Sequence, residues 1–81
     1  MTVATISEAL QRISTTEPCS PLAVFRTKRV DQVDVMFAST IRTQQRIEWG
    51  DISYLGSFHK ESLSEARQRL RDYSESMREV A

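Results

Sequence analysis

The sequence predicts a small α+β domain, in which an antiparallel sheet of three or four strands has an N-terminal and a C-terminal helix packed on one face. Three observations predict this class. A helix-capping pattern opens a segment near each end of the chain, apolar residues recur behind both at helical spacing, and the middle is rich in β-branched residues that alternate with others. We expect the order α-β-β-β-α in a single domain, residues 1–81.

The first helix is expected to begin at the capping pair Thr5 and Glu8, in which a hydroxyl caps the first turn and a carboxylate three residues later reaches back. The apolar residues that follow share one face of this helix: Ile6, Leu10 and Ile13. The helix should end near Ser14, because a loop that contains two prolines occupies 15–21.

The last helix is expected to open with a second capping pair, Ser62 and Glu65. Its apolar seam has spacings of three and four residues: Leu63, Ala66, Leu70, Tyr73, Met77 and Val80. Glu65 and Arg69 form a favourable i,i+4 pair on the solvent side. We favour packing of this seam against the domain's own sheet. A homodimer through the C-terminal helix stays open, although the seam is short for a coiled coil.

The middle of the chain favours strands. Leu22–Lys28 is rich in β-forming residues, and 33–42 alternates with a period of two. Gly50 and Asp51 suit a tight hairpin turn between strands at 46–49 and 52–55. A rival helix that ends at Gly50 fits a different set: Val33, Phe37, Thr40, Ile41, Gln44 and Ile47. The β-branched residues favour strands, and whether 31–49 is strand or helix stays open.

The composition limits the kinds of partner that the protein can bind and indicates the cellular compartment in which it works. The 11 basic and 11 acidic residues give a net charge of zero, which argues against a nonspecific polyanion binder and against an acidic DNA mimic. Cys19 is the only cysteine, and a secreted domain this small would usually need disulfides. The chain lacks a signal-peptide pattern and any stretch of transmembrane length. We therefore expect a cytoplasmic protein without membrane contact, in which Cys19 is an incidental thiol.

Catalysis finds little support in the sequence. His59 is the only histidine, so a multi-histidine metal site cannot form, and Gly50 and Gly56 are isolated rather than part of a phosphate-binding loop. Glu48 and Asp51 are better explained as solvated acids than as a general acid and base. We expect no enzymatic activity, no metal and no cofactor. His59 is interpreted as a loop residue before the last helix.

The basic residues suggest a binding surface, because nine of the eleven are arginines, whose forked guanidinium suits phosphates and guanine edges. Together with one tyrosine, they supply the candidate contacts for a nucleic acid or another partner: Arg26, Lys28, Arg29, Arg42, Arg46, Tyr54 and Lys60. Arg26 and Lys28 share one face of their expected strand. A solvated surface of mixed charge explains the same residues equally well, and the strand register decides between the two.

One segment resembles a known family. Leu55-Gly56-Ser57-Phe58 followed by Ser62-Leu63-Ser64-Glu65-Ala66-Arg67 is similar to the end of the arm-type DNA-binding domain of phage-integrase-type tyrosine recombinases. Phe58 replaces the family's usual tyrosine and Ser64 its usual alanine. The resemblance covers about a dozen residues, Leu55–Arg67. It implies a three-stranded sheet in the DNA major groove with a helix behind it, and it implies no recombinase activity, because the catalytic domain is absent.

Two functions follow as expectations. The first is a small non-catalytic, regulatory domain that lays the open face of its sheet on duplex DNA. The alternative is a protein-binding inhibitor or adaptor of the small accessory kind that phages and mobile elements encode, with aromatic anchors near the hairpin: Trp49, Tyr54 and Phe58. Core packing is the favoured interpretation of Trp49 itself. A double-stranded-RNA-binding domain shares the element order, but the lysine-rich start of its last helix is reduced here to Lys60.

Overall fold

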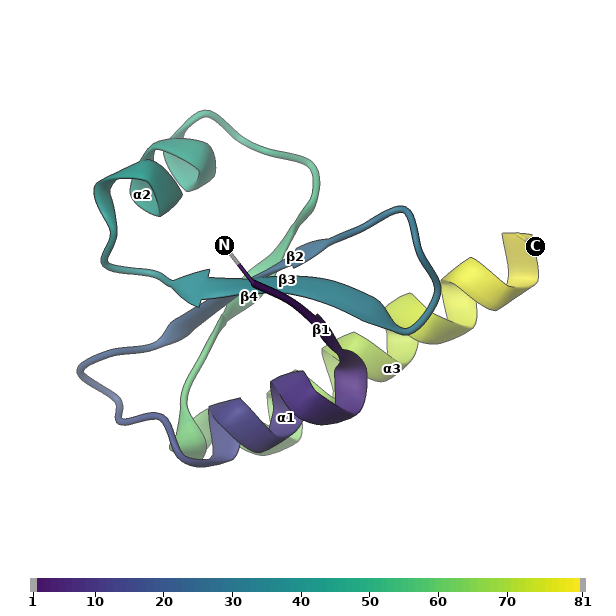
Figure 1. The fold of residues 1–81 in the computed structure, drawn as a ribbon, viewed down its shortest axis with the longest axis horizontal. Helices are drawn as coiled ribbons and strands as arrows, with labels where there is room; N and C mark the ends of the chain where they lie inside the picture. Colours follow the sequence, from purple (N-terminus) through teal and green to yellow (C-terminus); the bar gives the residue numbers. More distant parts are fainter. Residues whose placement is uncertain (1, 81) are drawn as a thin grey trace.

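A computed structural model describes residues 2–80 and confirms the α+β class. The elements are, in chain order, β1 (Thr2–Thr5), α1 (Ile6–Ser14), β2 (Leu22–Arg26), β3 (Gln32–Phe37), α2 (Ile41–Glu48), β4 (Tyr54–Phe58), a 3-10 turn η1 (Lys60–Ser62) and α3 (Leu63–Val80). The four strands form one antiparallel sheet in the order β1-β3-β2-β4 (Figure 1).

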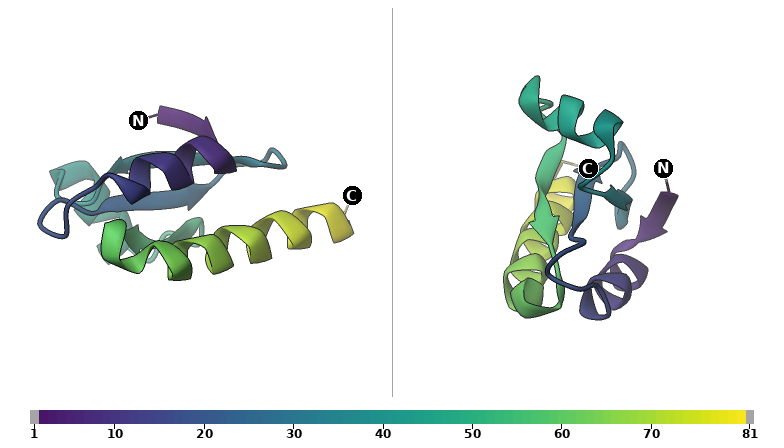
Figure 2. Two further views of the ribbon diagram at one scale, coloured as in Figure 1. Left: turned by 90° about the horizontal axis from the view of Figure 1, so that it is seen from below. Right: turned by 90° about the vertical axis from the view of Figure 1, so that its left-hand side faces the viewer.

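Helices α1 and α3 lie side by side on one face of the sheet, as the sequence predicts (Figure 2). Between them and the strands lies the main core, which contains these buried side chains: Ala4, Ala9, Ile13, Leu22, Val24, Val33, Val35, Phe58, Ala66, Leu70 and Tyr73. Helix α2 lies apart from α1 and α3, on the other side of the strands (Figures 1 and 2).

The N-terminal cap forms as expected. The Thr5 hydroxyl accepts a hydrogen bond from the Glu8 backbone N–H at 3.1 Å and donates to the Glu8 carboxylate at 3.0 Å, and α1 ends at Ser14. Strand β1 is an element that the sequence pattern does not predict. Its four residues are too few to show a period, and they become a strand by pairing antiparallel with β3.

The C-terminal seam packs on its own domain. Leu70 and Tyr73 are buried and Leu63 and Met77 pack against the same core, whereas the Val80 side chain lies outside the described part of the chain. The predicted cap at Ser62 is wrong in position. The helical segment begins one turn earlier: the His59 imidazole Nδ1 accepts from the Glu61 N–H at 3.2 Å, and the Ser62 hydroxyl accepts from the His59 N–H at 2.9 Å.

The expected hairpin around Gly50 is wrong, since 41–48 forms helix α2 while the period-two strand β3 ends at Phe37. Gly50 does adopt a positive φ of 73°, but it does so to end a helix. Its N–H donates to the Ile47 carbonyl at 3.1 Å, and the Asp51 N–H donates to the Arg46 carbonyl at 3.1 Å, which is the Schellman pattern. The same glycine thus satisfies the rival helical interpretation of this segment.

The Tyr73 hydroxyl attaches the β2–β3 loop to α3. It lies 2.9 Å from the Thr27 carbonyl oxygen, 3.0 Å from that of Arg29 and 3.3 Å from that of Gln32. Tyr73→Phe should lower the free energy of unfolding by about 1–3 kcal/mol, because half-buried carbonyls lose their donor while the ring packing is retained. Urea denaturation measures this change. A loss below about 0.5 kcal/mol would mean that water replaces the hydroxyl without cost.

Candidate functional site

The structure brings Arg26 and Lys28 to one hollow and Arg42 and Arg46 to another, but it does not gather all the predicted basic residues on one surface. Arg26 ends β2 on the side of α3, where its guanidinium donates to the Ile52 carbonyl at 2.8 Å, and it lines a hollow with Tyr73 and Met77. Lys28 and Arg29 are exposed in the β2–β3 loop. Arg26 therefore lies on the helix-covered side of the sheet and cannot join a contact surface on the opposite face.

Arg46 and Tyr54 are held in contacts within the domain. The Arg46 guanidinium forms an ion pair with Asp51 at 2.8 Å and lies 3.9 Å from the centre of the Phe25 ring. The Tyr54 ring centre is 5.3 Å from that of Phe25, and its hydroxyl is 2.6 Å from the Ser57 hydroxyl. Arg46 therefore holds α2 against the sheet, and Tyr54 links the side-chain packing of β4 to that of the neighbouring strand β2.

Arg42 is exposed to solvent, whereas Lys60 forms an ion pair with an acid of the same chain. Arg42 is exposed on α2, which is a helix and not the strand on which the sequence pattern places it. The Lys60 ammonium lies 3.0 Å from the Glu17 carboxylate, and that hydrogen-bonded acid raises the pKa of Lys60 above its ordinary value. The positive charge of Lys60 is thus compensated within the chain.

The face of the sheet opposite α1 and α3 is not open, which corrects a second expectation. Ala23 and Phe25 point to this face and are fully buried. Helix α2 lies over Phe25, with Thr43 buried and Arg46 stacked on the Phe25 ring. The neighbouring strand adds Asp34, whose buried Oδ1 has no hydrogen-bond partner among residues 2–80. A carboxylate here repels the phosphates of a nucleic acid.

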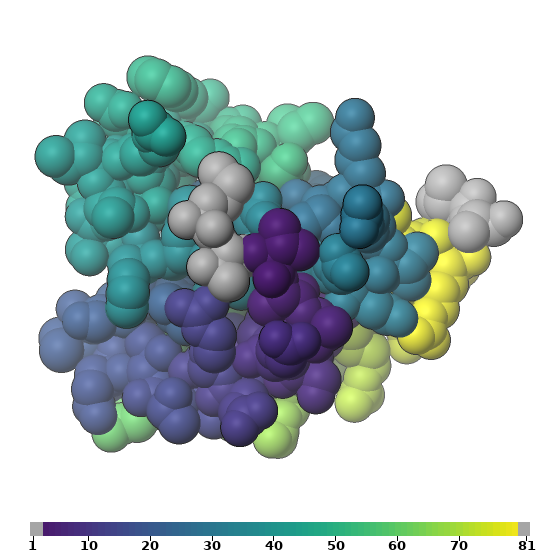
Figure 3. Space-filling model, viewed as in Figure 1, coloured from purple at the N-terminus to yellow at the C-terminus, as the bar shows by residue number. Residues whose placement is uncertain are grey.

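The outer surface of α2 and of the turn after it exposes large apolar side chains. Ile41 is 75% exposed, Trp49 is 78% exposed and Ile52 is 86% exposed, and we call these three residues the α2 surface. They lie in the part of the molecule that projects at the upper left in Figure 3. The interpretation of Trp49 as a core residue is wrong: α2 turns its other side, with Thr43, toward the sheet, so the residue that ends the helix remains in solvent.

A hollow next to the α2 surface gathers three arginines. Arg12 of α1 lines it with Arg42 and Arg46, and the hydroxyls of Thr40 and Thr43 lie in the same lining. The volume of the hollow is about 290 Å³. Sequence reasoning missed Arg12, because thirty residues separate it from Arg42 and it carries no local signal beyond its place in a helix. Arg46 is already paired with Asp51, so Arg12 and Arg42 supply the hollow's remaining positive charge.

Two acids acquire altered proton affinities in the fold. The Ser74 hydroxyl, followed by the Arg78 guanidinium, holds the pKa of Asp31 below its ordinary value. The Ser53 backbone N–H, followed by the Arg46 guanidinium, does the same for the pKa of Asp51. Both carboxylates are therefore stabilised in their charged form by the folded chain.

Acid should destabilise the domain through these two carboxylates. Because each folded pKa lies below the unfolded one, their stabilisation is complete above about pH 4 and is lost as the pH falls through the folded-state values. Urea denaturation between neutral and strongly acidic pH should show a fall in the free energy of unfolding below about pH 4. The Asp31→Asn/Asp51→Asn variant should show a shallower fall. Equal acid dependence of the two proteins would contradict this assignment.

Three further findings concern the described residues alone. Among residues 2–80, no group of three or more histidine, cysteine, aspartate or glutamate side chains is placed to hold a metal ion. Over the same residues, no helix is long and apolar enough to cross a membrane. Cys19 is an exposed free thiol.

Comparison with known proteins identified no relative of this chain. No protein-family model matches the chain, and no significant match was found among curated proteins or solved structures. The resemblance of Leu55–Arg67 to the arm-type domains of tyrosine recombinases therefore stays a prediction, although this segment does form the expected strand end and helix start.

Proposed function

We propose that the chain is a small non-catalytic protein-binding domain, an adaptor or inhibitor that contacts its partner through the α2 surface. The observation that carries this proposal is Trp49, a large aromatic side chain that the fold leaves 78% exposed between Ile41 and Ile52 in the sequence. Exposed aromatic residues of this kind are the usual anchors of protein interfaces, where they fill a pocket on the partner.

The geometry of α2 supports presentation of these anchors. Ile41 and Trp49 are eight residues apart, so they lie roughly 12 Å apart along the helix axis and about 80° apart around it, both on the exposed side of α2. The Schellman end at Gly50 and the bonds of Asp51 to Arg46 and Ser53 fix the turn that carries Ile52. A surface held in one shape in the free protein loses little conformational entropy when it binds.

Three observations favour a protein partner over duplex DNA. The predicted basic residues lie on different sides of the molecule, Arg46 and Lys60 are paired with acids, and Asp34 lies on the face that would meet the DNA. A DNA-binding surface needs positive charge gathered along one stripe or face. Contact of the chain with DNA stays a prediction, which the experiment below measures in parallel.

The test compares capture of partner proteins from a lysate of the source cell by three forms of the full chain. These are wild type, Trp49→Ala, and the control Val3→Ala, which shortens an exposed apolar side chain of β1. We expect wild type and the control to retain the same partner. Trp49→Ala should lose it, with a cost of about 2 kcal/mol or more, or roughly thirtyfold in Kd. Circular dichroism should show that all three are equally folded.

Trp49 also gives a direct signal, because it is the only tryptophan of the chain. In the free protein its fluorescence should resemble that of tryptophan in water and should be quenched freely by iodide. Addition of a purified, tryptophan-free partner should shift the emission to the blue and protect it from iodide. Equal capture of the partner by Trp49→Ala would contradict the proposal.

Fluorescence anisotropy with mixed-sequence duplex DNA is measured at low and at physiological salt. An affinity tighter than about 10 μM with a steep salt dependence, lost in Lys28→Ala/Arg29→Ala, would favour the DNA-binding function instead. Absence of binding even at low salt would leave the protein-binding function as the one supported.

A further inference from the structure

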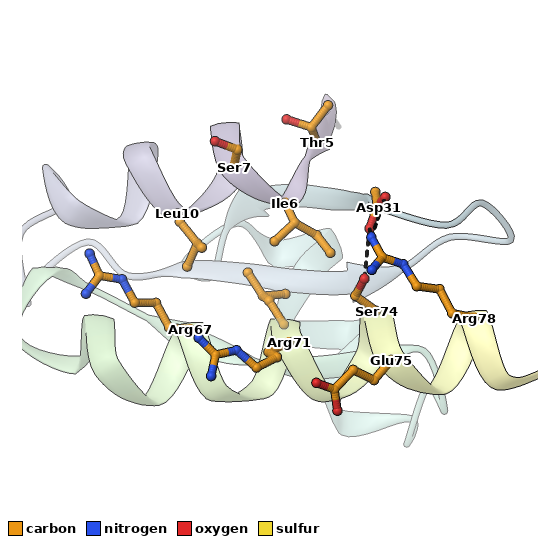
Figure 4. A pocket seen from close by; sticks show the side chains of 11 residues that line it. Thr5, Ile6, Ser7, Leu10, Asp31, Arg67, Arg71, Ser74, Glu75 and Arg78 are labelled. Atoms are coloured by element: carbon orange, nitrogen blue, oxygen red, sulfur yellow. Dashed lines mark hydrogen bonds and ion pairs between the residues drawn. The ribbon is translucent and has the colours of Figure 1, made fainter.

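A second surface lies on the opposite side of the molecule, in a groove between α1 and α3. The groove has a volume of about 680 Å³ (Figure 4). Ile6 and Leu10 extend into it from α1 (Figure 4), and the fully buried Leu70 of α3 also belongs to its lining. The lining is therefore apolar along its centre, while arginines from α3 stand along its edge (Figure 4).

Two of these arginines have no acidic partner within the domain. Arg67 and Arg71 are exposed one helical turn apart, and no ion pair joins either of them to an acid within residues 2–80. The other two arginines of α3 are paired: Arg69 with Glu65 at 3.8 Å, and Arg78 with Asp31 at 3.3 Å. Like charges at i,i+4 repel each other, so an anion between Arg67 and Arg71 would stabilise the helix.

The groove is polarised along its length. At one end, Asp31 accepts hydrogen bonds from Ser74 at 2.8 Å and from Arg78 at 3.3 Å, so its charge and that of Arg78 compensate each other (Figure 4). At the other end, Arg67 extends toward Leu10, and Arg71 lies one turn further along α3 (Figure 4). The Glu75 carboxylate also lines the groove, on the side of Ser74 and Arg78 (Figure 4), so net positive charge is confined to the end that holds Arg67 and Arg71.

We infer that this groove binds an acidic, amphipathic segment of a partner protein, whose apolar side chains contact the half-buried Ile6 and Leu10 and whose carboxylates pair with Arg67 and Arg71. Charge complementarity carries the inference, since guanidinium groups bind carboxylates in a two-pronged geometry. The shape agrees with a peptide. The lining runs from Arg67 to Arg78, roughly 16 Å along a helix axis, and is open along its length, whereas small-molecule sites enclose most of their ligand.

This inference does not rest on the proposed function. The groove is lined by β1, α1, α3 and the β2–β3 loop, and none of its residues belongs to the α2 surface. Two separate surfaces would allow the domain to contact two proteins at once, as an adaptor does.

The test is a selection of random twelve-residue peptides displayed on phage, carried out on the full-length chain and on the variant Arg67→Glu/Arg71→Glu. We expect wild type to enrich peptides that combine acidic residues with two or more large apolar residues. The variant should not enrich them. The control is Lys28→Glu/Arg29→Glu, which makes the same change in net charge on the exposed β2–β3 loop and should enrich the same peptides as wild type.

The best peptide is then synthesised, and its affinity for each protein is measured by fluorescence anisotropy. Charge reversal at Arg67 and Arg71 should weaken binding at least about tenfold, and added salt should weaken binding to wild type. The Trp49→Ala variant should bind this peptide as wild type does, which separates the groove from the α2 surface. Selection of peptides without acidic residues, or equal binding to the charge-reversed variant with a native circular dichroism spectrum, would overturn the inference.

Discussion

Phe25→Ala is expected to lower the free energy of unfolding by about 3–5 kcal/mol, which approaches the whole stability of a marginal small domain. Phe25 is fully buried, although its side chain points away from the main core. It contacts Tyr54 of β4 and supports the guanidinium of Arg46 on α2. Removal of the ring leaves a cavity on this side of the sheet, and α2 loses the surface on which it packs.

Urea denaturation followed by far-ultraviolet circular dichroism measures this loss. Phe25→Leu should cost less, because it keeps most of the apolar volume. The control Phe37→Ala removes the same side chain at a position that is 51% exposed on the same sheet, and it should cost much less. A small effect of Phe25→Ala, equal to that of Phe37→Ala, would mean that α2 does not depend on this contact.

Gly56→Ala is the second substitution with a large expected effect. Gly56 has a φ of 142°, which residues other than glycine rarely adopt and which costs them about 1–3 kcal/mol. An added Cβ would lie 2.8 Å from Cζ of the Phe58 ring. Phe58 is buried in the main core, so the ring cannot move away freely, and overpacking of this kind costs about 1–3 kcal/mol more.

Gly50→Ala is the matched control for this substitution. Gly50 also has a positive φ, 73°, but an added Cβ there meets no atom within 4 Å. Gly50→Ala should therefore lower the free energy of unfolding only by the cost of the positive φ, about 1–2 kcal/mol. Differential scanning calorimetry of both variants measures the difference. If Gly50→Ala destabilises the domain as much as Gly56→Ala, then contact with the Phe58 ring is not the cause.

Both interaction surfaces depend on how residues far apart in the sequence pack together, which explains why sequence reasoning found them only in part. The sequence offers Trp49 as an aromatic anchor only as the alternative to core packing, because its exposure depends on which side of α2 meets the sheet. Arg67 and Arg71 carry no signal of their own in an amphipathic helix, where charged residues on the outer side are ordinary. They define a groove only because the fold places Ile6 and Leu10, about sixty residues earlier, beside them.

The sequence by itself determined the elements whose signals are local. The capping pair Thr5 and Glu8 begins α1, the seam from Leu63 to Met77 forms α3, and alternation around Val33 and Val35 forms β3. In each case a period or a cap within a few residues selects one structure. The antiparallel sheet with two helices on one face follows, because these apolar faces can be buried only against one another.

Only the tertiary structure decided the segment from Ile41 to Leu55 and, with it, the surfaces. A positive φ at Gly50 serves a hairpin and a helix end equally well, so local preference leaves both open. The helix prevails because Arg46 then reaches both Asp51 and Phe25, residues that no local pattern joins. That contact closes the second face of the sheet and turns Trp49 outward, since packing between distant residues selects among conformations that are locally of similar energy.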